Sequence, residues 1–85
     1  MASKIYVGNL PFSMEDKDLE EVFSEFGEIS EAVIIKDKFS RRSKGFGFVT
    51  FVNESSAKKA VEEMNGKEVQ GRELKVNEAK PLEAR

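Results

Sequence analysis

The sequence predicts an α+β fold in which two helices cover one face of a four-stranded antiparallel sheet. Three observations predict it. Four short β-rich segments and two amphipathic segments alternate along the chain in the order βαββαβ. Each amphipathic segment carries one apolar stripe, and both stripes must be buried against a common face of the sheet. The 85 residues, 39% of them hydrophobic, have room for one small core, which excludes a second domain.

The first strand and the first helix follow from local patterns. Residues 4–9 read KIYVGN, a run of β-branched and aromatic residues typical of a short strand. Ser13 and Asp16 resemble a capping box, which predicts the start of a helix, and Gly27 predicts its end. Between these points an apolar stripe has the helical spacing i, i+3, i+4 and i+7: Leu19, Val22, Phe23 and Phe26.

The middle of the chain predicts two further strands and a second helix. Residues 29–36 and 45–52 are both β-rich, and the polar, charged segment 37–43 between them predicts a basic loop. Asn53 is a favourable residue for the start of a helix, and the Asn-Gly pair at 65–66 predicts its end. The apolar stripe of this helix repeats the spacing of the first: Ala57, Ala60, Val61 and Met64.

The last predicted element is a half-buried strand at residues 72–77, after a turn at Gln70-Gly71. Leu74 and Val76 alternate with polar residues, so we expect them to point into the core and their neighbours to point outward. The resulting order, with both helices on one side, is that of a ferredoxin-like βαββαβ sandwich. The opposite face of the sheet is expected to remain open to water.

Aromatic side chains are expected on that open face. Period-2 alternation divides the third strand into two sets of side chains, Gly45, Gly47, Val49 and Phe51 on one side and Lys44, Phe46, Phe48 and Thr50 on the other. Whichever set is buried, an aromatic ring remains outside. In the first strand Ile5 and Val7 are natural core residues, which directs Tyr6 outward. Exposed apolar patches usually mark a binding site.

Residues 44–51 read KGFGFVTF and match, at every position, the octamer signature K/R-G-F/Y-G/A-F-V-x-F/Y of the RNA-recognition motif. Residues 5–10, IYVGNL, resemble the partner hexamer on the first strand. The chain therefore resembles the RNA-recognition motif family, as one domain over residues 3–79 with a short tail at residues 80–85. The segment VNEA at 76–79, followed directly by Lys-Pro, resembles the short stand-alone members of the family found in bacteria.

The resemblance implies a surface for single-stranded nucleic acid. In this family the rings that correspond to Tyr6, Phe46 and Phe48 form a platform on which bases stack, and the first residue of the octamer meets a phosphate. Stacking a base on one ring contributes about 1 to 3 kcal/mol to binding. By the predicted register, side chains of the second and fourth strands flank this platform, with Ala32 and Ile34 on the buried side. The predicted RNA-binding residues are Tyr6, Phe46, Phe48, Lys44, Val33, Ile35, Lys75, Asn77, Lys4, Arg41 and Arg42.

The net charge of −2 argues, taken over the whole chain, against a nucleic-acid ligand. The charges are segregated, however. Residues 1–31 carry two cations against eight acidic residues, whereas residues 36–44 carry five cations (Lys36, Lys38, Arg41, Arg42 and Lys44) against one acid, Asp37. Because the screening length is about 8 Å at physiological salt, a ligand responds to the local patch more than to the distant total.

Composition also disfavours other functions. The chain contains no Cys and no His, which excludes disulfides, the usual zinc ligands and histidine-dependent catalysis. We therefore expect a protein that is not an enzyme and that needs neither a metal nor another cofactor. No apolar run reaches the ~18 residues of a membrane span, so we expect no membrane partner. The resemblance to the short bacterial members implies a cytoplasmic location.

Three function classes remain. The first, which we favour, is a monomeric binder of single-stranded RNA, with single-stranded DNA open as a second ligand. The second is a protein-interaction module on the same fold; family members of that kind generally lack an intact aromatic platform. The third is an enzyme, but no catalytic constellation accompanies the carboxylates, and the G-x-G at 45–47 lacks the third glycine and the strand-to-helix setting of a nucleotide-binding fingerprint.

Overall fold

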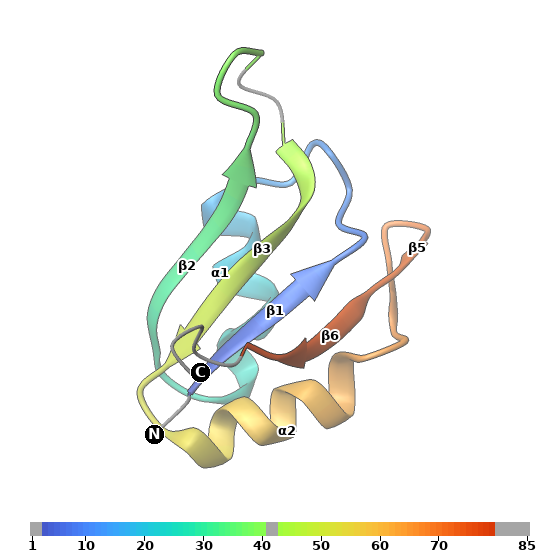
Figure 1. The fold of residues 1–85 in the computed structure, drawn as a ribbon. Helices are drawn as coiled ribbons and strands as arrows, with labels where there is room; N and C mark the ends of the chain where they lie inside the picture. The colour runs from blue at the N-terminus through green and yellow to red at the C-terminus, as the bar shows by residue number, and fades with distance from the viewer. Residues whose placement is uncertain (1–2, 41–42, 80–85) are drawn as a thin grey trace, which may run out of the picture.

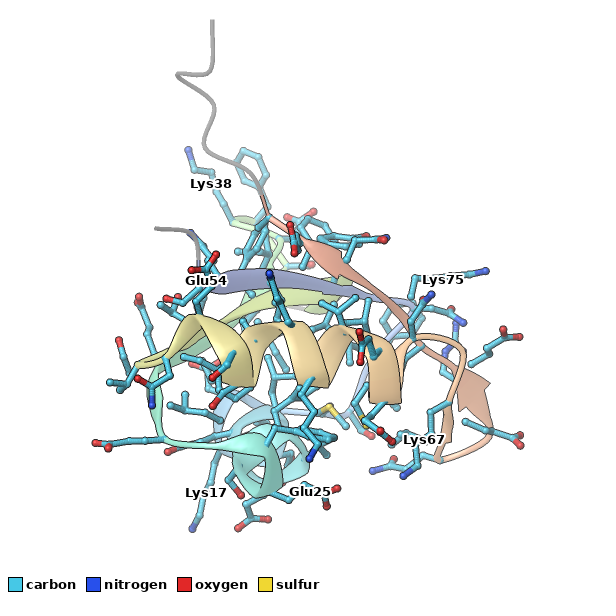
Figure 2. The ribbon with its side chains drawn as sticks, turned by 90° about the horizontal axis from the view of Figure 1, so that it is seen from below. Lys17, Glu25, Lys38, Glu54, Lys67 and Lys75 are labelled. Carbon is cyan, nitrogen blue, oxygen red and sulfur yellow. The ribbon has the colours of Figure 1, made fainter. Side chains whose placement is uncertain are left out.

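The computed structural model describes residues 3–40 and 43–79 and, within these ranges, all side chains except those of residues 43 and 44. Its main sheet has four antiparallel strands in the order β2-β3-β1-β6 (Figure 1). These strands are β1 (Lys4–Gly8), β2 (Ile29–Lys36), β3 (Ser43–Phe51) and β6 (Lys75–Glu78). The helices α1 (Asp16–Phe23) and α2 (Glu54–Met64) lie together on one side of the sheet (Figure 2). The arrangement confirms the predicted α+β class and the βαββαβ order.

The core lies between the sheet and the two helices. Both predicted stripes turn toward it: Leu19 and Phe23 of α1 and Ala57, Ala60 and Met64 of α2 are buried. The sheet contributes Ile5, Val7, Ile34, Val49, Phe51 and Val76. Because a fully buried side chain of this size contributes about 1.5 to 3 kcal/mol, this layer of contacts accounts for most of the favourable free energy of folding.

The first helix begins later than predicted. Ser13 and Asp16 do not form the capping box; the helix is capped by Glu15, whose backbone N–H donates to the Asp18 carboxylate at 3.0 Å. The Asp16 carboxylate instead accepts a hydrogen bond from the backbone N–H of Ile34 in β2, at 2.8 Å. The Asp16 side chain, which the local pattern assigns to the helix cap, therefore binds a backbone group of another element instead.

The predicted strand at residues 72–77 is also divided. Gln70 and Gly71 have positive φ angles of 51° and 81°, which form the two-residue turn of a small hairpin between β4 (Glu68–Val69) and β5 (Arg72–Glu73). Leu74 then passes into the core, fully buried, and β6 begins at the next residue. The hairpin, which the sequence pattern did not predict, lies beside the end of β1 (Figure 1).

The remaining helix ends agree more closely with the predictions. Asn53 occupies the N-cap position of α2, although its side chain makes no capping hydrogen bond. After Phe23, α1 passes into a short 3-10 helix, η1 (Ser24–Phe26), which ends at Gly27. This tighter turn carries Phe26, so the last member of the first stripe is only partly buried.

Candidate nucleic-acid interface

Three aromatic rings meet on the face of the sheet that the helices leave open. The ring centroids of Tyr6 and Phe46 are 5.8 Å apart, those of Tyr6 and Phe48 are 5.9 Å apart, and those of Phe46 and Phe48 are 6.3 Å apart. The planes are tilted or perpendicular, with angles of 37°, 63° and 90° in the same order. Each residue is half-buried, so one part of each ring packs against its neighbours and the rest faces solvent. We call these three residues the platform.

The strand register explains how the platform is built. Tyr6 in β1 is the direct partner of Phe48 in β3, and Gly8 is the partner of Phe46. A Cβ atom added at Gly8 would lie 2.5 Å from the Tyr6 hydroxyl oxygen, so the Tyr6 ring lies over the glycine and leans toward Phe46. The absence of a side chain at this position is therefore part of the platform's geometry.

The reverse side of β3 confirms the predicted alternation. Val49 and Phe51 are fully buried, at 0% and 1% exposure. A Cβ atom at Gly47 would collide with the backbone carbonyl of Val33 and come within 3.3 Å of the Leu19 side chain. The glycine thus lets β2 and α1 pack tightly behind the rings, and only the set containing Phe46 and Phe48 remains outward.

The edge strands place the predicted flanking residues in line with the rings. Val33 of β2 is the partner of Phe48, and Asn77 of β6 is the partner of Tyr6, so Val33, Phe48, Tyr6 and Asn77 form one row across the sheet. Lys75 is the partner of Gly8 in the next row. Ile35 falls beside a register shift in β2 and is half-buried. The register therefore aligns Val33 and Asn77 with the rings and places Lys75 one row away, whereas it gives Ile35 no direct partner.

Cations border the platform as well. The Lys4 ammonium nitrogen lies 4.9 Å from the centroid of the Phe48 ring, a cation–π contact on the open side. Figure 2 shows Lys75 at the level of the sheet, while Lys17 and Glu25 lie on the helical side. Arg41 and Arg42 lie outside the described residues, and so does the side chain of Lys44, whose backbone belongs to β3.

Two exposed aromatic residues lie outside the predicted set. Phe12, in the loop after β1, is 64% exposed. The guanidinium carbon of Arg72 lies over its ring, 5.4 Å from the centroid. Phe39, in the loop between β2 and β3, is 90% exposed. The signal available in the sequence was that neither ring fits an apolar stripe or a strand alternation.

The described residues offer little to other kinds of site. Within residues 3–40 and 43–79, no group of three or more acidic side chains is arranged to hold a metal ion. Over the same ranges, no helix is long and apolar enough to cross a membrane.

Similar proteins share both the sequence and the fold. The family model of the RNA recognition motif matches residues 5–75. Glycine-rich RNA-binding protein 4, mitochondrial, of Arabidopsis thaliana is 48% identical over 77 residues, which cover 91% of this chain and 57% of that protein. Glycine-rich RNA-binding protein 10 of Brassica napus is 51% identical over 76 residues, covering 89% of this chain and 45% of that protein. A solved structure, the Sxl-lethal protein/RNA complex, has a TM-score of 0.89 at 32% identity and covers 95% of this chain and 48% of that chain.

The chain spans about half the length of the curated relatives it matches. The family match over residues 5–75 includes both helices, all of β3 and β1 from its second residue, and it ends at Lys75, the first residue of β6. The octamer in β3 and the hexamer in β1 lie side by side in the sheet, which brings the two motifs of the resemblance into one surface. The chain belongs to the RNA recognition motif family.

Proposed function

We propose that this chain binds single-stranded RNA on the open face of its sheet. The observation that carries the proposal is the platform: three rings in mutual contact, on central strands, opposite a fully buried core. Single-stranded nucleic acid exposes flat bases, and each base gains about 1 to 3 kcal/mol by stacking on such a ring. Because the rings are already held by their neighbours, little ordering is needed before bases can stack.

The similar proteins support this proposal. The relatives in Arabidopsis thaliana and Brassica napus are RNA-binding proteins by name, and the similar solved structure is a complex with RNA. The alternative, a protein-interaction module, is not favoured by any feature of the sheet face, because all three rings of the platform are present.

The flanking residues give each part of a nucleotide a partner. In this proposal bases stack on Tyr6, Phe46 and Phe48, and the amide of Asn77 hydrogen-bonds to a base edge beside Tyr6. Lys4 leaves the face of Phe48 when a base stacks there, and its ammonium group pairs with a phosphate.

The remaining predicted residues are proposed to act around the platform. Lys75 contacts the sugar-phosphate backbone of the RNA at the other end of the platform. Val33 and Ile35 provide apolar surface at the edge of β2, while Lys44, Arg41 and Arg42 are proposed to add phosphate contacts.

The proposal also covers the broader properties of the chain. The binding domain comprises residues 3–79 and acts as a monomer, without catalysis, metal or cofactor. We propose a cytoplasmic location, although one similar relative is mitochondrial by name, so fractionation of the source cells is the appropriate test. Single-stranded DNA is a second ligand of the same surface, because stacking does not depend on the sugar.

Titration of labelled oligonucleotides tests the proposal. The protein is mixed with single-stranded RNA, single-stranded DNA of the same sequence and the corresponding duplex, and binding is followed by fluorescence anisotropy. We expect binding to the single strands at about micromolar dissociation constants and weaker binding to the duplex, whose bases are not available for stacking. Equal affinity for duplex and single strand would contradict a stacking platform. Size-exclusion chromatography of the free protein tests the monomer.

A further inference from the structure

A second aromatic site lies at the end of the sheet, where the loop after β1 meets the β4–β5 hairpin (Figure 1). Asn9 joins the two segments. Its backbone is left-handed, with φ of 59°, a conformation that Asn tolerates better than most residues. Its side-chain nitrogen donates to the backbone carbonyl of Glu73 at 2.7 Å, and its side-chain oxygen accepts a hydrogen bond from Arg72 at 3.0 Å. The loop and the hairpin are therefore fastened together.

This junction holds an exposed ring in a fixed place. The guanidinium carbon of Arg72 lies 5.4 Å from the centroid of the Phe12 ring. The ring also lies close to Gly45, where an added Cβ atom would lie 3.2 Å from a ring carbon of Phe12. Gly45 also has a φ of 86°, so a larger residue is disfavoured there for two reasons. The residue Phe12 is nevertheless 64% exposed, so its side chain is accessible to a ligand.

The site is continuous with the platform. Gly45 immediately precedes Phe46, and its carbonyl accepts the backbone N–H of Leu10 at 2.8 Å, which closes the loop after β1 over the start of β3. Gly8, at the end of β1, is the partner of both Phe46 and Lys75. A nucleic-acid strand that extends from the platform beyond Phe46 therefore comes close to Phe12 and Arg72.

The charge at this end of the sheet also fits a nucleic acid. The guanidinium group has five N–H donors, and within the described part of the chain it uses them on Asn9 alone. Lys75, which pairs with Gly8 at the end of β1, adds a second cation at this end of the sheet. The nearest acid along the hairpin, Glu73, has its carboxylate beside Gly66, where an added Cβ atom would lie 3.6 Å from it. The donors of Arg72 are thus available to a phosphate.

We propose that Phe12 and Arg72 extend the platform and hold one further nucleotide of the same single strand. Its base stacks on the exposed part of the Phe12 ring, and its phosphate accepts hydrogen bonds from Arg72. This inference rests on the proposed function, because it assigns the extra nucleotide to the strand that the platform binds. The two sites differ in reach: the three rings bind a short oligonucleotide, and the extension acts only on a longer one.

A length series tests the extension. Affinities are measured for two RNAs. One has about four nucleotides, enough to cover the three rings of the platform, and the other has about eight. Phe12→Ala is expected to weaken binding of the longer RNA by about 5- to 150-fold, the equivalent of one lost base-ring stack, and to leave binding of the shorter RNA unchanged. Val52→Ala, which truncates a 52% exposed side chain immediately after the opposite end of β3, is the control and should affect neither RNA.

Arg72→Gln provides a second, independent measurement. Loss of one phosphate contact should make the log-log salt dependence shallower by about 0.7 for the longer RNA only. If Phe12→Ala binds both RNAs as the unchanged protein does, and the salt dependence of Arg72→Gln is also unchanged, the extension is wrong while the platform stands. If the unchanged protein binds neither RNA, the proposed function fails first. Equal loss for both lengths would place Phe12 in the platform itself and also overturn the extension. Thermal midpoints of each variant exclude loss by unfolding.

Discussion

The ring of Tyr6 lies directly over Gly8, two residues further along the same strand, so that no side chain fits beneath it. Gly8 does not have a positive φ angle, and its conformation is open to other residues. Its role is therefore to leave space for the ring that joins the two phenylalanines of β3.

This relationship predicts the effect of Gly8→Ala. The new methyl group must displace the Tyr6 ring, so binding of single-stranded RNA should weaken. The loss should not exceed the contribution of one stacked base, about 1 to 3 kcal/mol. The free energy of unfolding should change by less than about 1 kcal/mol, because alanine is favoured over glycine within a strand. The measurement is a double-mutant cycle with Tyr6→Ala. An equal loss with and without the tyrosine would contradict the relationship.

Substitution of the platform rings should separate binding from stability. Tyr6→Ala, Phe46→Ala and Phe48→Ala should each remove about 1 to 3 kcal/mol of binding while the thermal midpoint changes little, because the rings lie outside the core. Phe51→Ala is the matched control on the same strand. Its ring is 1% exposed, so its loss should cost about 3 to 5 kcal/mol of stability and weaken binding only through unfolding. The reverse pattern, unfolding by the outer rings and no effect of Phe51, would overturn the assignment of the two faces.

The basic residues predict a measurable dependence on salt. Lys4 and Lys75 border the platform, and Lys44, Arg41 and Arg42 are predicted to join them, which gives about four or five phosphate contacts and a log-log slope of about −3 for a single strand. Affinity should be measured over a range of salt concentrations. A slope near zero would mean that these cations do not meet phosphates.

The hydrogen bond from Ile34 to Asp16 predicts a specific loss of stability. Asp16→Ala leaves a partly buried backbone N–H without its partner, at a cost of about 1 to 3 kcal/mol, whereas Asp16→Asn keeps an acceptor oxygen and should cost less. Glu20→Ala, an exposed change on the same helix, should stay within about 0.5 kcal/mol. Chemical denaturation measures all three. Equal effects of Asp16→Ala and Glu20→Ala would show that the hydrogen bond contributes nothing.

The sequence predicted those features that depend on short periods. The bounds of β2 were predicted without error, and the alternation in β3 placed Phe46 and Phe48 outward and Phe51 inward, because side chains of a strand alternate strictly between faces. The roles of the predicted RNA-binding residues remain predictions. The start of α1 was wrong, because the Asp16 side chain is used by a residue of another element.

Contacts between distant residues were beyond the reach of local patterns. The strands β4 and β5 have two residues each, too few for a periodicity to be recognised. The contact between Asn9 and Arg72 joins residues 63 positions apart, and no feature of either segment points to the other. The contact between Arg72 and the Phe12 ring likewise joins distant segments and could be recognised only in the folded chain.

The order β2-β3-β1-β6 has a consequence for the motions of the protein. Both ring-bearing strands are central, so β1 is hydrogen-bonded to β3 and β6, and β3 to β2 and β1. Amide protons on doubly paired strands exchange with solvent only when large parts of a sheet open, whereas edge strands and hairpins open locally. Hydrogen–deuterium exchange should therefore be slowest beneath Tyr6 and Phe48 and faster in the β4–β5 hairpin. The platform is thus carried by the part of the backbone that we expect to open least often, and the segments expected to open more readily lie around it.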